Sequence, residues 1–183
     1  MRAAVWRRLA VRFGPGDRVL ELNCGTGVDA AWLTGRGVEV LATDASEGMV
    51  QVARGRGVRA EVLDASAVGD LPGGPFDGAL SNFGGLNCVD DPAVVAQGLA
   101  AQVRPGGSVV LCVMGPVVPW EWLWYLGHLQ PAKAFRRLRS STQWRGLTIR
   151  YPSARSLRRT FEPWFTCERV WALGAFVPPS YAE

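Results

Sequence analysis

The stretch VLELNCGTG, residues 19–27, joins an apolar run to a glycine-rich turn. A short apolar run that ends in glycines is typical of a buried strand leading into the N-terminus of a helix. Glycines at this spacing let the backbone approach a nucleotide-like ligand closely. Two acids flank the turn, Glu21 before it and Asp29 after it. The stretch therefore predicts a site for a nucleotide-type ligand at the end of the first strand.

Strand-like and helix-like segments alternate from this turn to residue 114. Apolar, β-branched segments predict the strands, and Asp91 with Pro92 predicts a capped helix start. The expected helices are 1–13, 28–34, 47–54 and 91–103, and the expected strands lie within 18–23, 35–46, 55–66, 76–83 and 108–114. This alternation predicts an α/β fold: a doubly wound, mostly parallel sheet with helices on both faces.

Acidic residues recur at the ends of the predicted strands. The segments GRGVEVLATDAS at 35–46 and GRGVRAEVLDAS at 55–66 both end in Asp-Ala-Ser. We interpret them as two similar strands and not as a solenoid repeat, because the pattern occurs only twice. Ligands of doubly wound sheets bind beyond the carboxyl ends of the strands. Asn23, Asp44, Asp64 and residues 81–83 are therefore expected along one ligand-binding edge.

Length and composition predict a single domain. A chain of 183 residues, 48% of them hydrophobic, can form one substantial core and is short for two. Residues 1–115 are expected to be the cofactor-binding half and 116–183 the substrate or lid half. In the second half, helices are expected at 119–129, 131–140 and 153–165, and strands at 147–152 and 167–177.

The cysteines and the single histidine exclude some kinds of site. The four cysteines are scattered without close pairs, so neither a metal site nor a disulfide framework is expected, and the compartment is expected to be the reducing cytoplasm. The arginine-rich start lacks the uninterrupted apolar run of a secretory signal; we interpret it as a helix, with a transit peptide as the alternative. No segment is apolar for long enough to span a bilayer. Cys24 is interpreted as a small residue filling the turn, and His128 as a surface or hydrogen-bonded residue and not a general base.

Charge separates two candidate ligands. Gly25, Gly27 and Ala30 satisfy the dinucleotide fingerprint, with Asp44 near the distance of its ribose-binding acid. However, Asp29 in the first turn of the helix and Glu21 beneath it would each cost a diphosphate about 1 kcal/mol or more. S-adenosylmethionine (SAM) carries a sulfonium and an ammonium group and no phosphate. The acidic edge therefore favours SAM over a dinucleotide.

Taken together, the motifs resemble those of class I SAM-dependent methyltransferases, from about residue 18 to residue 114. VLELNCGTG resembles the first motif, LATDAS the second, VLDAS the third, FDGALSNFGGLN the fourth and VRPGGSVVL the fifth. Asn23 replaces the usual first glycine, and asparagine tolerates left-handed backbone geometry better than most residues. Members of the family usually carry more residues before the first helix and a final antiparallel strand. We therefore expect a shortened or truncated member without that strand.

The resemblance implies a set of SAM-binding residues. It places the methionine moiety at Glu21 and the turn around Gly25, the ribose hydroxyls at Asp44, adenine at Asp64 and Ala65, and a wall beside the sulfonium at Asn82 and Phe83. The full expected set is Glu21, Asn23, Cys24, Gly25, Gly27, Asp44, Ala45, Met49, Asp64, Ala65, Asn82 and Phe83. No catalytic residue and no metal ligand is assigned.

The expected function is methyl transfer from SAM, by in-line displacement, to the oxygen, nitrogen or carbon atom of a small-molecule acceptor. Aromatic residues at 120–125 and an acid-free basic block between Glu121 and Glu162 favour an acceptor with an apolar body and an anionic group, or peripheral contact with a membrane. The plainer interpretation is aromatic packing beside a solvated basic face. A nucleic-acid substrate is disfavoured, because the fourth motif lacks an Asn/Asp-Pro-Pro-aromatic run. Two alternatives stay open: a non-catalytic SAM-binding domain and a nicotinamide-dependent oxidoreductase.

Overall fold

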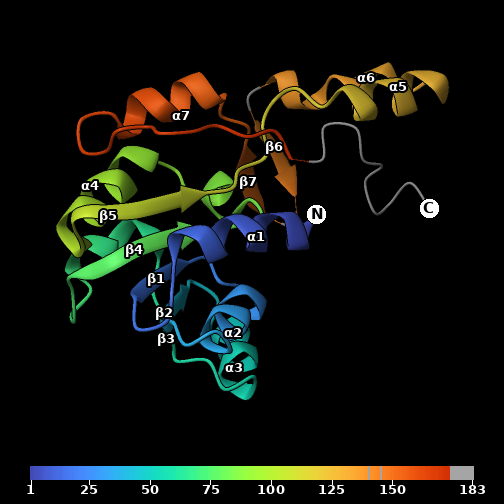
Figure 1. Cartoon of the computed structure of the whole chain (residues 1–183). Helices are drawn as coiled ribbons and strands as arrows, with labels where there is room; N and C mark the ends of the chain where they lie inside the picture. Colours follow the sequence, from blue (N-terminus) through green and yellow to red (C-terminus); the bar gives the residue numbers. More distant parts are fainter. Residues whose placement is uncertain (140, 145, 174–183) are drawn as a thin grey trace.

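A five-stranded parallel sheet forms the centre of the structure, a computed structural model that describes residues 1–139, 141–144 and 146–173 (Figure 1). The strand order is β3-β2-β1-β4-β5, and each neighbouring pair is parallel. The strands are β1 (Arg18–Leu22), β2 (Glu39–Asp44), β3 (Ala60–Val62), β4 (Phe76–Ser81) and β5 (Val103–Leu111). The predicted doubly wound α/β fold is confirmed.

Helices cover both faces of this sheet, because alternate residues of each strand point to opposite sides. On one face, Val19 of β1 packs in a cluster with α1 (Arg2–Arg12), α2 (Val28–Thr34) and α3 (Glu47–Gly55). On the other, Leu20 and Leu22 pack with the 3₁₀ helix η1 (Ala65–Asp70) and with α4 (Pro92–Gln102) and α7 (Ala154–Phe161). Buried residues therefore come from the sheet and from the helices on both of its faces.

Local sequence signals place the starts of two helices where they were expected. The side chain of Asp91 accepts a hydrogen bond from the amide of Ala93 at 2.9 Å, and Pro92 takes the first helical position of α4. Ser153 caps α7 by accepting from the amide of Ser156 at 3.1 Å. Each cap satisfies a backbone donor that the first helical turn cannot satisfy by itself.

The second half of the chain departs further from the predictions. The expected helix over 131–140 is only the short α6 (Pro131–Ala134) followed by the 3₁₀ helix η3 (Arg136–Arg139). Strand β6 (Ser141–Trp144) was not predicted; it pairs antiparallel with the expected β7 (Leu147–Arg150) in a sheet of its own. Helix α5 (Pro119–Gly127) and α6 project beyond the carboxyl ends of β4 and β5 (Figure 1).

Two strand predictions were wrong in part. Strand β5 already begins at Val103, so residues 104–107 lie within the strand and are not a break before it. Within the expected strand at 167–177, residues 167–173 have no strand structure, and 174–177 lie outside the described residues. The described strands of the main sheet are all parallel. No helix among the described residues is both long and apolar enough to cross a membrane.

Candidate functional site

The glycine-rich turn after β1 has three residues with left-handed backbone geometry. Asn23 and Gly25 both have φ near 54°, and Gly27 has φ 72°; the prediction for Asn23 is confirmed. A Cβ added at Gly27 would lie 2.7 Å from the Cβ of Ala53, so close packing requires glycine there. A Cβ at Gly25 would meet no atom of the described residues within 4 Å. The backbone at Gly25 is therefore open to a ligand, whereas Gly27 is part of the packing.

Asp44 connects the first two motifs at the carboxyl end of β2. Its Oδ2 accepts a hydrogen bond from the amide of Gly25 at 2.8 Å, and its Oδ1 accepts from the amide of Ser46 at 2.9 Å. The side chain that caps α3 is Ser46, so Asp44 is not an ordinary helix cap. Its half-buried carboxylate lies beside the open backbone of the turn.

Glu21 is a buried carboxyl group with an unused hydrogen-bonding atom. The residue is 1% exposed, it accepts from the backbone amide of Ala30, and its Oε2 has no hydrogen-bond partner among the described residues. Burial raises the pKa of Glu21 well above its usual value, and the neighbouring Asp29 raises it further. A ligand that supplies a proton donor or a positive charge would satisfy this carboxyl group.

Asp29 links three elements from a position that is 4% exposed. Its Oδ1 lies 2.6 Å from Nε1 of Trp6 and 2.6 Å from Nη1 of Arg2, and its Oδ2 accepts from Nδ2 of Asn82 at 2.8 Å. These contacts join α1, α2 and the residues after β4. Because Arg2 balances the charge of Asp29, the repulsion of a diphosphate expected from Asp29 is offset. The acidic character of the edge comes from Asp44 and Asp64 instead.

The residues after β4 form the other wall of this region. Oδ1 of Asn82 accepts from the amide of Phe83 at 2.9 Å, and Ser81 donates to Oδ1 of Asn23 at 3.1 Å. Phe83 has φ 49° and is 39% exposed, an unusual combination for a bulky residue. The guanidinium of Arg2 lies 4.4 Å from the centre of the Phe83 ring.

The remaining predicted residues lie at the same edge but outside this contact network. Leu63 donates its amide to the carbonyl of Asp44 at 3.0 Å, which places Asp64 next along the edge. The carboxylate of Asp64 accepts from the amide and hydroxyl of Ser66, and these bonds lower its pKa. Ala65 is buried, whereas Ala45 and Met49 are exposed. No described contact joins these four side chains to Glu21.

Two residues of the network were missed by sequence reasoning. Arg2 and Trp6 are four positions apart, so they lie on one face of α1 and both reach Asp29. That spacing is visible in the sequence, but it does not identify the shared partner.

Cys24 lies buried in the turn, and His128 lies outside the contact network of the site. Burial raises the pKa of the Cys24 thiol to about 12, so the thiol stays protonated near neutral pH. His128 is exposed at the end of α5, where its Nδ1 lies 2.8 Å from the carbonyl of Trp124. Among the described residues, no group of three or more His, Cys, Asp or Glu is placed to hold a metal ion.

Known proteins resemble this chain in both sequence and structure. Residues 19–107 match a family model described as a methyltransferase domain. A demethylmenaquinone methyltransferase of Mycobacterium sp. (strain KMS) is 38% identical over 110 residues, which are 58% of this chain and 47% of that protein. The chain thus spans about half the length of the curated relatives it matches.

Solved structures extend the likeness to the fold. A SAM-dependent methyltransferase from Mesorhizobium loti superposes with a TM-score of 0.66 at 20% identity, covering 87% of this chain and 78% of that one. The glycopeptide N-methyltransferase MtfA, solved in complex with SAM, is 25% identical with a TM-score of 0.50, covering 58% of this chain and 52% of that one. The matched family region spans the glycine-rich turn, Asp44, Asp64 and the residues after β4.

Proposed function

We propose, because residues 19–107 match a methyltransferase-domain model and the motifs resemble those of class I SAM-dependent methyltransferases, that the chain binds SAM at the carboxyl edge of the sheet and transfers the methyl group to a small-molecule acceptor. The observation that carries the proposal is the buried carboxyl group of Glu21, one oxygen of which has no hydrogen-bond partner in the described part of the chain, in the strand that leads to an open glycine turn. In this proposal residues 1–115 hold the cofactor, and residues 116–183 form the acceptor or lid half.

The acidic residues suit the different parts of SAM. Glu21 would accept from the ammonium group, directly or through water, which would satisfy its buried oxygen. Each oxygen of Asp44 accepts one backbone amide and keeps capacity for a further donor, so both can also accept from ribose hydroxyls. Oδ1 of Asp64 is engaged by Ser66, and its Oδ2 would accept from the adenine amino group beside Ala65.

Arg2 adds a residue for the methionine carboxylate. Its side chain is 40% exposed, and it is held between Asp29 and the ring of Phe83. A guanidinium has five N–H donors in a planar fork, so the contact with Asp29 leaves donors for a second carboxylate. We assign Arg2 to this carboxylate and the neighbouring Asn82 and Phe83 to the wall beside the sulfonium.

When bound, SAM supplies a methyl group on a positively charged sulfur that is open to nucleophilic attack. The chain contributes alignment and exclusion of water, which can lower the barrier by about 7 kcal/mol or more when the geometry is tight. A general base would be needed only for an acceptor whose pKa is high, such as a hydroxyl group. No catalytic residue is assigned.

For the acceptor, we propose a small molecule with an apolar body and an anionic group. Trp122 and Phe135 pack at a centroid distance of 5.7 Å in a lobe beyond the carboxyl ends of β4 and β5, which supports an apolar acceptor. Arg136 and Arg137 already form ion pairs with Glu121, so they are not evidence that the acceptor carries an anionic group. The proposed location is the cytoplasm, where the free cysteines Cys24, Cys88, Cys112 and Cys167 stay reduced.

Isothermal calorimetry with SAM, S-adenosylhomocysteine and NADH tests this function. The wild-type chain is expected to bind both adenosyl compounds and not NADH. Asp44→Ala should weaken binding at least about tenfold, since it removes a charged hydrogen-bond acceptor. Asp70→Ala, at an exposed position of η1, is the matched control and should bind normally.

Each other outcome contradicts a defined part of the proposal. Unchanged affinity in Asp44→Ala would remove the ribose assignment. Binding of NADH without SAM would favour the oxidoreductase. Tight SAM binding without methyl transfer to any of a broad acceptor panel would favour a non-catalytic SAM-binding domain.

A further inference from the structure

In helix α5 a glutamate is buried while two leucines are exposed. The one residue of α5 that is buried is Glu121, at 1% exposure, whereas Leu123 is 68% and Leu126 44% exposed. Soluble helices usually turn leucine inward and glutamate outward. The reversal gives α5 an apolar outer face that needs an explanation.

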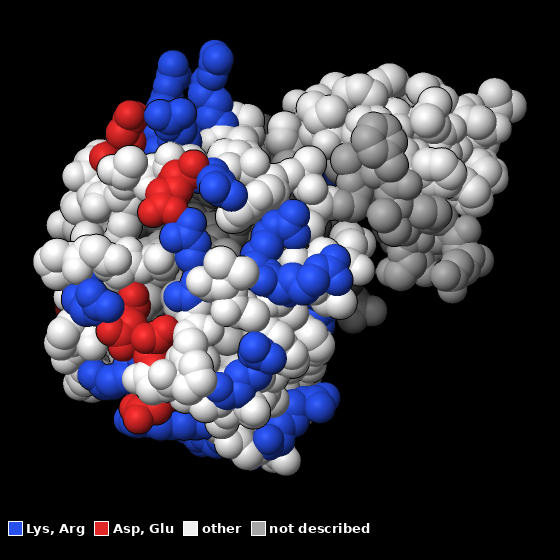
Figure 2. Space-filling model, in the orientation of Figure 1, with Lys and Arg blue, Asp and Glu red and all other residues white. Residues whose placement is uncertain are grey.

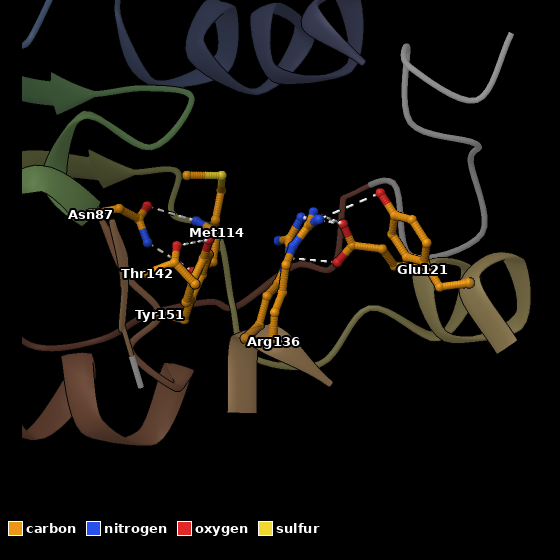
Figure 3. A network of polar contacts seen from close by, with 8 residues as sticks. Asn87, Met114, Glu121, Arg136, Thr142 and Tyr151 are labelled. Carbon is orange, nitrogen blue, oxygen red and sulfur yellow. Dashed lines mark hydrogen bonds and ion pairs between the residues drawn. The ribbon is translucent and has the colours of Figure 1, made fainter. Parts of the chain in front are cut away.

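The buried ion pairs keep α5 in this orientation. Oε1 of Glu121 lies 2.5 Å from Nη2 of Arg136, and Oε2 lies 2.7 Å from Nε of Arg137 (Figure 3). Arg136 also donates to the hydroxyl of Tyr125 at 3.4 Å. Removing one partner of such a pair leaves an uncompensated buried charge, so rotating α5 to bury its leucines would be costly.

The apolar face continues past the end of α5. Leu129, between α5 and α6, is 90% exposed and has φ 56°. Phe135 and Leu138, after α6, are 41% and 53% exposed. The part of this lobe that is visible in Figure 2 is almost entirely uncharged. A leucine in a left-handed conformation is strained, so Leu129 combines backbone strain with nearly complete exposure to water.

A basic helix lies on the same side of the molecule. Figure 1 places α7 and the α5–α6 lobe along the same upper edge, and Figure 2 shows basic side chains standing out above α7. The exposed residues of α7 include Arg155, Arg158 and Arg159, and none of the three forms an ion pair with another described residue. Leu157 and Phe161 of α7 pack inward.

We propose that the α5–α6 lobe and α7 form one docking surface for an anionic lipid membrane. Leu123, Leu126 and Leu129 would enter the boundary between headgroups and acyl chains, and the arginines of α7 would lie on the phosphates. A membrane satisfies both features together, because it offers an apolar phase beneath a negatively charged surface. The lobe lies beyond the carboxyl ends of β4 and β5, so docking would bring lipid close to the cofactor edge. The proposal does not depend on SAM binding.

Vesicle co-sedimentation with the full chain tests this surface. Vesicles of phosphatidylcholine mixed with phosphatidylglycerol are expected to bind the protein, and vesicles of phosphatidylcholine alone to bind it much less. Binding to the anionic vesicles should fall as salt is raised. Leu129→Gly should weaken binding about tenfold, and the double variant Arg158→Gln, Arg159→Gln by about tenfold or more.

Two controls separate docking from misfolding. Glycine adopts the backbone geometry of Leu129 without strain, so Leu129→Gly should keep or raise the melting temperature. Val52→Ser changes a residue on α3 that is 47% exposed, close to the exposure of Leu126, and should bind vesicles normally.

Three results would overturn the proposal. One is equal binding to neutral and anionic vesicles, or to neither. Another is Leu129→Gly binding as wild type does. The third is light scattering that shows a dimer lost in Leu123→Ser, since the apolar face would then be an interface between copies of this chain. Affinity for S-adenosylhomocysteine, measured on the same samples, reports separately on the proposed function.

Discussion

Glu21 makes the folded chain sensitive to pH. Its pKa is raised in the folded state, so between its unfolded and folded pKa values the folded chain binds more protons than the unfolded chain. The free energy of unfolding contributed by Glu21 is therefore fully present at acidic pH, and it is lost as the pH rises above the unfolded value through the folded one. The same carboxyl group is proposed to bind the SAM ammonium group. Glu21 is thus a binding residue that lowers the free energy of unfolding of the ligand-free chain at higher pH.

Glu21→Gln should stabilise the ligand-free protein near neutral pH by about 1–3 kcal/mol, because the folded chain then no longer has to bury the charge of Glu21 or take up a proton to neutralise it. Urea unfolding at several pH values measures this difference, which should shrink toward acidic pH. Calorimetry on the same variant should show weaker SAM binding. A variant less stable than wild type at neutral pH would show that Glu21 is well satisfied in the fold.

The two glycines of the turn should respond differently to alanine. Both have positive φ, so each substitution carries backbone strain of about 1 kcal/mol. Gly27→Ala should cost a further 1–3 kcal/mol, roughly, because its Cβ would meet Ala53. Gly25→Ala should be milder for stability and more harmful to SAM affinity, since its Cβ would stand in the open approach. Thermal unfolding and calorimetry of both variants measure this contrast, which equal effects on both quantities would contradict.

At this scale the sequence predicted the backbone geometry of Asn23 and the place of Asp44 at the strand ends. The left-handed Asn23 and the position of Asp44 beside Gly25 follow from the motif itself. The role of Asp29 does not follow from the motif, because its charge is balanced by Arg2, which is 27 positions earlier in the chain. No local pattern specifies that pairing.

Helix α1 contributes two side chains to the contact network of the candidate site. Its side chains Arg2 and Trp6 reach Asp29, and Trp6 also stacks on Trp32 of α2 with ring centres 5.0 Å apart. The contacts of Asp29 therefore depend on the start of α1.

Arg2→Met should weaken binding of S-adenosylhomocysteine by about tenfold or more, because a charge-assisted hydrogen bond is lost. The decarboxylated analogue of S-adenosylhomocysteine should bind wild type and variant alike, which separates loss of the carboxylate contact from a general disturbance by unpaired Asp29. Arg7→Met, at an exposed position of the same helix, is the control. Tighter binding by Arg2→Met would mean that Arg2 occupies the ammonium position and blocks the site.

Elements with strong local signals were predicted closely, and elements without them were not. Helix α4 begins at the expected Pro92, since its cap is written in adjacent residues. Strand β6 was missed because its polar residues gain strand geometry from pairing with β7. The expected strand over 167–177 has a β-branched, apolar pattern, but residues 167–173 do not join the sheet and instead approach α1 through contacts such as Glu168 with Arg12.

The molecule as a whole should be stabilised by the proposed cofactor. A ligand at about one hundred times its dissociation constant adds about 2.7 kcal/mol to the free energy of unfolding. For a chain of 183 residues this corresponds to a rise in melting temperature of about 5–10 °C. Differential scanning fluorimetry with S-adenosylhomocysteine should show this rise and none with NADH. A rise in melting temperature with NADH alone would contradict the inference, drawn from the acidic edge, that the ligand is SAM.

The sequence by itself determined the parallel sheet, the glycine turn, and the acids at the ends of β1, β2 and β3, because periodicity and strand direction are local properties. Tertiary structure alone decided that Arg2 and Trp6 meet Asp29, that Glu121 is buried against Arg136 and Arg137, and that α5 turns its leucines to water. These contacts join residues whose spacing in the chain carries no signal. They form only when the packing of the whole chain has brought α1 over the sheet and folded α5 against η3.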